Sequence, residues 1–128
     1  MGIPGSLCSQ GDLLLQRKTV PLRTSAQLAS RLDAAGYREI VLVGINLSAY
    51  GQECGLSLCD AVDAVCSAPG ISRVRLGSLE PDRMDDATLQ RLAAQPKLCP
   101  QFHLSLQSGC DATLRRMNRH YTADEYAA

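Results

Sequence analysis

Segments with the apolar spacing of a helix alternate along the chain with apolar runs typical of strands. Residues 24–36 read TSAQLASRLDAAG, in which the leucines and alanines fall on one stripe of a helix. Thr24 and Gln27 have the spacing of a capping box, and Gly36 is a suitable C-terminal stop. Residues 39–44 follow as EIVLVG, a continuous apolar run typical of a strand buried on both faces. The pattern predicts a helix followed closely by a buried strand.

The same order of helix and strand recurs. The remaining predicted elements are a helix over 56–67, a strand over 71–81, a helix over 85–94 capped by Asp85 or Asp86, a strand over 101–107, a helix over 111–118 and a helix from Thr122 with a capping box to Glu125. Short connections without hairpin signals favour an α/β fold of parallel strands with crossover helices. A doubly wound sheet and a piece of a (β/α) barrel both fit this order. No GxGxxG motif occurs at a strand-to-helix turn, which weakens the dinucleotide-binding version.

The segment QFHLSLQ at 101–107 alternates strictly between polar and apolar residues. In a barrel, one face of each strand meets the helices and the other meets the interior, near the C-terminal mouth where barrel enzymes place their chemistry. We therefore expect Phe102, Leu104 and Leu106 to face helices, and His103, Ser105 and Gln107 to line a wet interior. The preceding strand divides in the same way, with Val74 and Leu76 against Arg73, Arg75 and Gly77. An edge strand with one solvated face is the alternative interpretation.

Composition adds little to this picture. The chain has 128 residues, 45% of them hydrophobic, and its 13 basic and 13 acidic side chains cancel, so net charge points to no partner. No apolar run approaches the ~18 residues of a membrane span, and the start lacks the features of a secretory signal. A cytoplasmic location without a membrane partner is expected. Of the six cysteines, Cys59 and Cys66 share a helical stripe with apolar residues and are predicted to be core thiols.

Three motifs resemble the radical-SAM core of the methylthiotransferase family. They are AGYREIVLVGINLSAYG at 35–51, RLGSLEP at 75–81 and FHLSLQSGCDATLRRMNRHYT at 102–122. The similarity covers roughly Arg17 to the C-terminus. GSLEP together with HLSLQSGCD is most similar to the branch that acts on N6-threonylcarbamoyladenosine beside the tRNA anticodon.

This resemblance implies a partial (β/α) barrel in which a 4Fe-4S iron–sulfur cluster binds S-adenosylmethionine (SAM). In the family, reduction of SAM gives a deoxyadenosyl radical, which removes hydrogen from the adenine ring. A second cluster, held by a separate N-terminal domain, delivers the methylthio group. The cofactors carry this chemistry while the protein orients and shields them. The implied partner is tRNA.

The resemblance also places SAM-binding positions at the ends of the strands. The candidate cofactor-binding residues are Asn46, Glu80, Ser105, Gln107 and Arg119. Their amide, carboxylate, hydroxyl and guanidinium groups suit an amino-acid zwitterion, a ribose or a phosphate. Structural roles are the alternatives, with Asn46 as a turn residue, Glu80 as a turn cap and the nearby Arg115 and Arg116 on a solvated helix face. No catalytic residue is assigned.

The family's cluster motif is C-x-x-x-C-x-x-C. Laid without gaps on this chain, its three ligand positions fall on Pro4, Cys8 and Gly11, so Cys8 is the only candidate metal ligand. Proline and glycine have no side-chain donor, and one thiolate does not normally hold a cubane cluster. No other trio of the cysteines has the required spacing.

Two interpretations follow. In the first, the chain is a fragment of a methylthiotransferase, broken by a false start, a frameshift or an artificial boundary. In the second, it is a degenerate module that serves in SAM binding, RNA binding or assembly. Both divide the chain into a divergent segment over 1–16 and a partial radical-SAM core over 17–128, and an unrelated small α/β ligand-binding domain is a third, weaker alternative. We expect the isolated chain to be inactive, and to associate with itself or with missing parts of the enzyme because its sheet edges lack neighbours.

Overall fold

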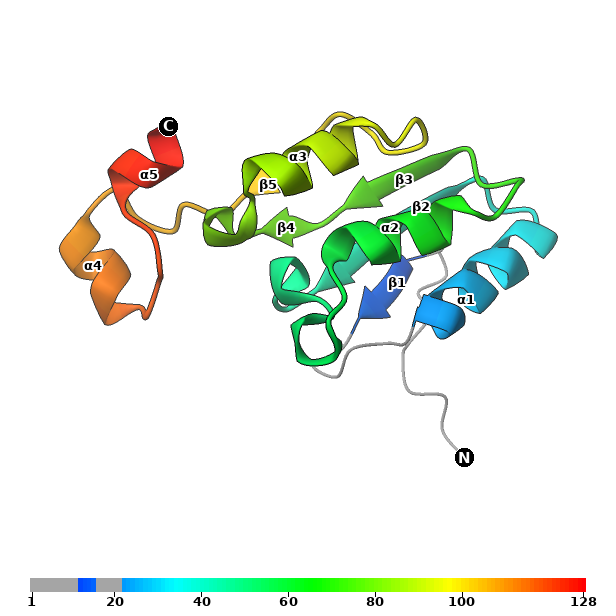
Figure 1. Ribbon diagram of the computed structural model, residues 1–128, viewed down its shortest axis with the longest axis horizontal. Coiled ribbons are helices and arrows are strands. Elements are labelled where there is room, and N and C mark those ends of the chain that lie inside the picture. Colours follow the sequence, from blue (N-terminus) through cyan, green and yellow to red (C-terminus); the bar gives the residue numbers. More distant parts are fainter. Residues whose placement is uncertain (1–11, 16–21) are drawn as a thin grey trace.

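The computed structural model describes residues 12–15 and 22–128. Three parallel strands form the main sheet in the order β1 (Asp12–Leu15), β2 (Glu39–Gly44) and β3 (Arg73–Leu76) (Figure 1). A second parallel pair consists of β4 (Ser78–Leu79) and β5 (His103–Leu104). Gly77 alone separates β3 from β4, and its N–H donates to the carbonyl of Leu42 at 2.7 Å. The chain from β3 through β4 therefore stays attached to β2 across the break.

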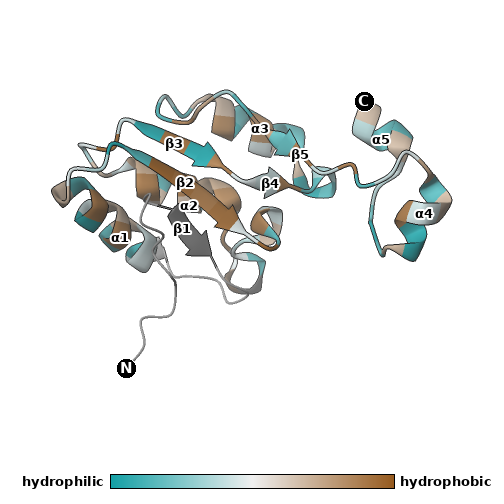
Figure 2. Ribbon diagram, turned by 180° about the vertical axis from the view of Figure 1, so that it is seen from behind, coloured by the Kyte–Doolittle hydropathy of each residue, from teal (hydrophilic) through white to brown (hydrophobic). Residues whose placement is uncertain are grey.

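Helices cover only one face of the main sheet. These are α1 (Leu22–Ala34), α2 (Leu58–Cys66) and α3 (Asp86–Ala93) (Figure 1). The view from behind in Figure 2 shows the other face of β2 and β3 without a covering helix. Two short helices, α4 (Asp111–Arg116) and α5 (Ala123–Ala127), lie beyond the carboxyl end of β4. Three 3-10 turns complete the described elements: η1 (Leu47–Ala49), η2 (Gln52–Cys54) and η3 (Pro81–Arg83).

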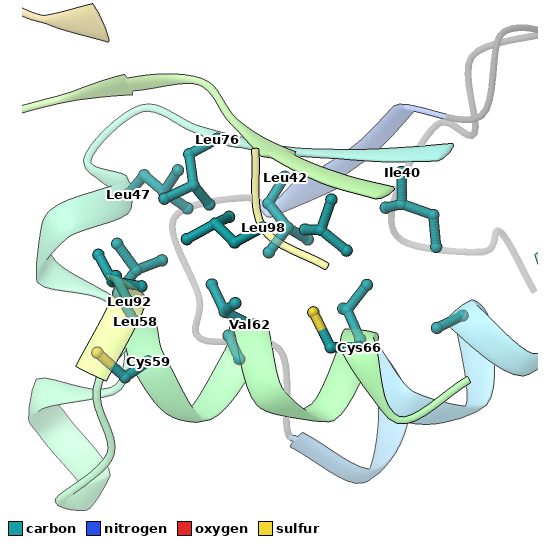
Figure 3. Close-up of a cluster of buried hydrophobic side chains, with 14 of the residues drawn as sticks. Ile40, Leu42, Leu47, Leu58, Cys59, Val62, Cys66, Leu76, Leu92 and Leu98 are labelled. Carbon is teal, nitrogen blue, oxygen red and sulfur yellow. The ribbon is translucent and has the colours of Figure 1, made fainter. Parts of the chain in front are cut away.

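The core lies between the sheet and α2. Figure 3 shows its labelled members, which come from the strands, α2, α3 and the loops: Ile40, Leu42, Leu47, Leu58, Cys59, Val62, Cys66, Leu76, Leu92 and Leu98. Ile40 and Val62 are fully buried, and burying an aliphatic side chain of this size contributes about 2 kcal/mol. Because this layer holds β2 and β3 firmly, the ends of these strands are fixed in space.

The predicted class and strand direction are confirmed. The structure is α/β with short parallel strands, and the predicted helices are present with boundaries that shift by a few residues. Asp85 caps α3 by accepting the N–H of Thr88 at 2.8 Å. Thr122 and Glu125 form the predicted capping box of α5. Within the described residues, no helix combines the length and apolar character needed to cross a membrane.

Several local predictions are wrong. The first helix begins at Leu22, so Thr24 lies inside it and cannot cap it. The strand expected over 71–81 is divided at Gly77, and the strand expected over 101–107 shrinks to the two residues of β5. Phe102, expected to face helices, is 39% exposed and lies just before β5 instead of within it. β1 was not predicted at all.

Some predictions lie outside the described residues. The cluster-motif positions Pro4, Cys8 and Gly11 belong to this group. The proposed boundary between residues 1–16 and 17–128 stays a prediction.

Candidate functional site

Polar side chains pair across neighbouring strands on the side away from the core. Arg73 Nε lies 3.0 Å from Glu39 Oε2, and these residues are direct register partners in β3 and β2. Ser78 Oγ and His103 Nδ1 are 3.1 Å apart and are register partners in β4 and β5. Such cross-strand pairs stabilise a sheet modestly and favour a hydrated face. Two of the polar residues predicted for this side, Arg73 and His103, therefore point away from the core and are exposed.

Glu80 lies where the loops after two strands meet. Its N–H donates to Ser48 Oγ at 2.8 Å, and the Ser48 hydroxyl lies 3.4 Å from the Glu80 carbonyl oxygen. The Arg119 guanidinium donates from Nη1 to Glu80 Oε1. Both side chains of this ion pair are about three-quarters buried, with 25% exposure for Arg119 and 23% for Glu80. Glu80 thus joins the loop after β2 to the segment that connects α4 and α5.

Arg119 keeps one donor without a partner. Its Nε is buried and makes no hydrogen bond within the part of the chain that the structure describes. An unmade hydrogen bond at a buried charged group is costly, so such a donor suits a site that gains an acceptor when a ligand binds.

Ser105 continues the β4–β5 pairing toward Glu80. Its N–H donates to the carbonyl of Leu79 at 2.9 Å, one residue before Glu80. The Tyr121 hydroxyl donates to the carbonyls of Ser105 at 2.6 Å and Leu106 at 3.2 Å. Burial raises the pKa of Tyr121, so the hydroxyl stays a donor at neutral pH. Ser105 is held between a strand and a tyrosine, with its side chain half-buried.

Asn46 and Gln107 lie at the margins of this group. Asn46 directly precedes η1 and is exposed, two residues before the Ser48 that holds Glu80. Gln107 is also exposed, and its φ of 67° puts its backbone in the left-handed region. The structure therefore brings Glu80, Ser105 and Arg119 together, and places Asn46 and Gln107 on loops that flank them.

The described cysteines do not form a metal site. Cys59 and Cys66 are buried in the core, which confirms their prediction as core thiols. Burial raises the pKa of Cys66 to about 11, so this thiol is a poor metal ligand at neutral pH. Cys54 and Cys110 are exposed. Among the described residues, no three cysteine, histidine or acidic side chains gather in a way that could hold a metal ion.

A pocket of about 330 Å³ opens beside Ser48. The loop between β2 and α2 forms one wall, and η3 with the start of α3 forms the other. Its lining includes the side chains of Ser57, Arg83 and Thr88. Because Ser48 also binds the backbone of Glu80, the pocket adjoins the candidate site.

Sequence patterns missed several of these residues. Ser48 lies inside the motif at 35–51 but was not singled out there, because its role depends on the loops after β2 and β4 folding together. Tyr121 stands next to the basic helix end, but the carbonyls that it binds are 15 and 16 residues earlier. Arg83 and its pocket depend on the packing of η3 against α2, which no spacing encodes.

Known proteins match most of the chain. It is 35% identical over 109 residues to the threonylcarbamoyladenosine tRNA methylthiotransferase MtaB of Thermotoga maritima, covering 85% of this chain and 25% of that protein. It is 41% identical over 95 residues to the tRNA-2-methylthio-N(6)-dimethylallyladenosine synthase of Anaeromyxobacter dehalogenans, covering 74% of this chain and 20% of that protein. The chain is a relative of the tRNA methylthiotransferases. No protein-family model matches it.

The relationship to the tRNA methylthiotransferases confirms the resemblance predicted from the three motifs. MtaB of Aquifex aeolicus is similar to the same extent, with 36% identity over 109 residues that cover 85% of this chain and 27% of that protein. The chain spans about a quarter of the length of these relatives.

Proposed function

We propose that this chain provides part of the radical-SAM core of a tRNA methylthiotransferase, the branch that acts on N6-threonylcarbamoyladenosine next to the anticodon. The observation that carries the proposal is the convergence of Glu80, Ser105 and Arg119 where parallel strands end, in a chain 35% identical to MtaB. Ligands of open parallel sheets bind outside the carboxyl ends of the strands. In this proposal, the hydrated face of the sheet is the inner face of a partial (β/α) barrel, and the protein acts on tRNA in the cytoplasm.

SAM fits the donors present at this end of the sheet. Asn46, Glu80, Ser105, Gln107 and Arg119 offer both donors and acceptors for an amino-acid zwitterion and a ribose, and the unpartnered Arg119 Nε is one donor that a ligand would satisfy. When bound, SAM would supply the adenosyl group for the radical chemistry of the family. The role of these residues is to bind and orient SAM, with Arg119 and Ser48 holding Glu80 in place.

The iron–sulfur cluster does not fit this chain. Only Cys8 stands at a cluster-ligand position, while Pro4 and Gly11 provide no ligand atom. We derive no step through the cluster, and we propose that the isolated chain has no methylthiotransferase activity. The same residues favour the second candidate function, a non-catalytic SAM- or RNA-binding module. An in-register C-x-x-x-C-x-x-C in the DNA upstream of the reading frame would favour the broken enzyme over this module.

Equilibrium dialysis against S-adenosylhomocysteine tests cofactor binding directly, and it works whether or not the chain self-associates. Glu80→Gln removes the negative charge of the carboxylate, and we expect it to weaken retention of the ligand about tenfold. Glu39→Gln is the matched control, because Glu39 is a partly exposed carboxylate that also pairs with an arginine, Arg73. Equal retention by the two variants, or no retention by the unmodified chain, would contradict the proposal.

A further inference from the structure

The pocket beside Ser48 is separate from the residues proposed to hold SAM, yet it shares a wall with them. Ser48 lines the pocket, and the same hydroxyl accepts the Glu80 N–H at 2.8 Å. Pro81, the first residue of η3, directly follows Glu80. The pocket and Glu80 therefore lie next to each other, on either side of Ser48.

The polar lining of the pocket has an unusual mixture of groups. Hydroxyls come from Ser48, Ser57 and Thr88, and Arg83 contributes a guanidinium. The Nε of Arg83 lies 3.9 Å from Asp82 Oδ2, which is too long for a hydrogen bond. Within the described residues, no hydrogen bond from the Arg83 side chain is present. Its fork of N–H donors is paired only loosely with Asp82 and retains donors for a planar anion such as a carboxylate.

The negative charges of the pocket are largely balanced by their own neighbours. Asp85 accepts the Thr88 N–H at 2.8 Å and sits at the N-terminus of α3. These hydrogen bonds lower the pKa of Asp85, and the helix dipole favours its charge. Asp82 forms its ion pair with Arg83. Both carboxylates can still accept hydrogen bonds from N–H or O–H groups of a ligand.

We propose that this pocket binds the threonylcarbamoyl substituent of a modified adenosine, with Arg83 as its specificity-determining residue. This inference rests on the proposed function, because it takes the adenosine to lie next to Glu80. The substituent has a carboxylate for Arg83, N–H and hydroxyl donors for the aspartates and serines, and a methyl group for the apolar part of the wall at Leu56 and Met84. A volume of about 330 Å³ is at the small end of ligand pockets and suits a substituent better than a whole nucleotide.

The same lining disfavours a dimethylallyl substituent. That group has no hydrogen-bonding atom, so it would displace water from the Arg83 guanidinium without giving it an acceptor. A site built to hydrogen-bond a ligand strongly rejects an analogue that lacks the hydrogen-bonding atoms. An apolar site rejects an analogue with an additional polar atom much more weakly. The pocket would thus separate the two substrate classes for which the relatives are named.

Equilibrium dialysis with three free nucleosides tests the inference: N6-threonylcarbamoyladenosine, N6-dimethylallyladenosine and adenosine. We expect the first to be retained at least tenfold more strongly than the other two. Arg83→Met keeps an unbranched stem like the aliphatic part of arginine and removes the charged guanidinium, and it should abolish most of this preference. Arg31→Met is the control, because Arg31 is an exposed arginine on α1 that does not line the pocket. A thermal melt of each variant verifies folding.

Equal retention of the three nucleosides, or no retention of any of them, would overturn the inference. The same nucleoside preference in the Arg83→Met and Arg31→Met variants would also overturn it. The S-adenosylhomocysteine experiment distinguishes a wrong pocket assignment from a wrong proposed function. Retention of S-adenosylhomocysteine without the nucleoside preference would refute the pocket assignment alone. The nucleoside preference without retention of S-adenosylhomocysteine would refute the cofactor site and leave the pocket in place.

Discussion

At Gln107 the backbone has a φ of 67°, a conformation that costs an L residue about 1 kcal/mol relative to glycine. Strained residues of this kind often lie at binding sites, where the surrounding structure holds them in place. We predict that Gln107→Gly increases the free energy of unfolding by about 1 kcal/mol, because it relieves this strain. The same change should weaken binding of S-adenosylhomocysteine, because it removes the side-chain amide. Urea denaturation and dialysis measure the two effects on one variant.

Asn118 provides the control for Gln107. Its φ of 57° is also left-handed, but it follows α4 as an ordinary helix-ending residue. Asn118→Gly should stabilise the chain less, because asparagine tolerates the left-handed region better than glutamine does, and it should leave ligand binding unchanged. If Gln107→Gly behaved in the same way as Asn118→Gly, Gln107 would have no binding role.

Residue roles were predictable where they depend on local spacing. The caps at Asp85 and Thr122 follow from the sequence because a cap bonds to the N–H two or three residues ahead. The ion pair of Glu80 with Arg119 spans 39 positions, and no local rule encodes it. Both residues were candidates for the cofactor site, but their contact with each other was not predicted.

Among the elements, α2 offers a test that depends on pH. Burial raises the pKa of Cys66 from 9.0 to about 11 in the folded chain. Below pH 8 the thiol is neutral in both states, so it adds no pH dependence. As the pH rises from 9 to 11, the unfolded thiol ionises before the folded one, and the folded state loses about 2 kcal/mol. Urea denaturation at several pH values measures this loss.

Variants assign the pH dependence to its source. Cys66→Ala should reduce the loss of stability between pH 9 and pH 11 without abolishing it, because burial also raises the pKa of Cys59. The variant should lower stability overall by leaving a small cavity. Cys54→Ala should leave the shape of the curve unchanged, because Cys54 is exposed. Parallel curves for the two variants would show that Cys66 is not buried as described.

Elements were predicted best where burial is continuous. EIVLVG and the stripe of α2 are fixed by apolar side chains that must leave water, so their type follows from pattern alone. The alternating segment 101–107 predicted a longer strand than the structure has, since only His103 and Leu104 are register partners of β4. The carbonyls of Ser105 and Leu106 accept hydrogen bonds from the Tyr121 hydroxyl instead of from a neighbouring strand. The alternating pattern cannot predict that a side chain replaces the strand as hydrogen-bond partner.

For the molecule as a whole, we predict no cleavage of SAM by the isolated chain. The physical reason is the lack of a thiolate at positions 4 and 11. Anaerobic reconstitution with iron and sulfide, followed by measurement of 5′-deoxyadenosine, tests this expectation. A full-length methylthiotransferase under the same conditions is the positive control, and substantial deoxyadenosine from the isolated chain would refute the prediction.

The overall α/β class with parallel strands was predictable, because the alternation of helix and strand without hairpins leaves few other topologies. The location of the site at the strand ends followed from the family motifs. The pocket beside Ser48 did not, because its two walls come from segments about 30 residues apart that the fold brings together, with Ser48 bonded to Glu80.

Photo-crosslinking tests the central claim, that an adenosyl cofactor binds where β2, β4 and β5 end. The chain would be irradiated with an 8-azidoadenosyl analogue of SAM, digested and mapped by mass spectrometry, with excess S-adenosylhomocysteine as competitor. Our account predicts competable labels on the peptides that contain Asn46, Glu80 and Ser105 to Gln107. Labels confined to α1 or to the helix-covered side of the sheet, or labels that the competitor does not reduce, would contradict it.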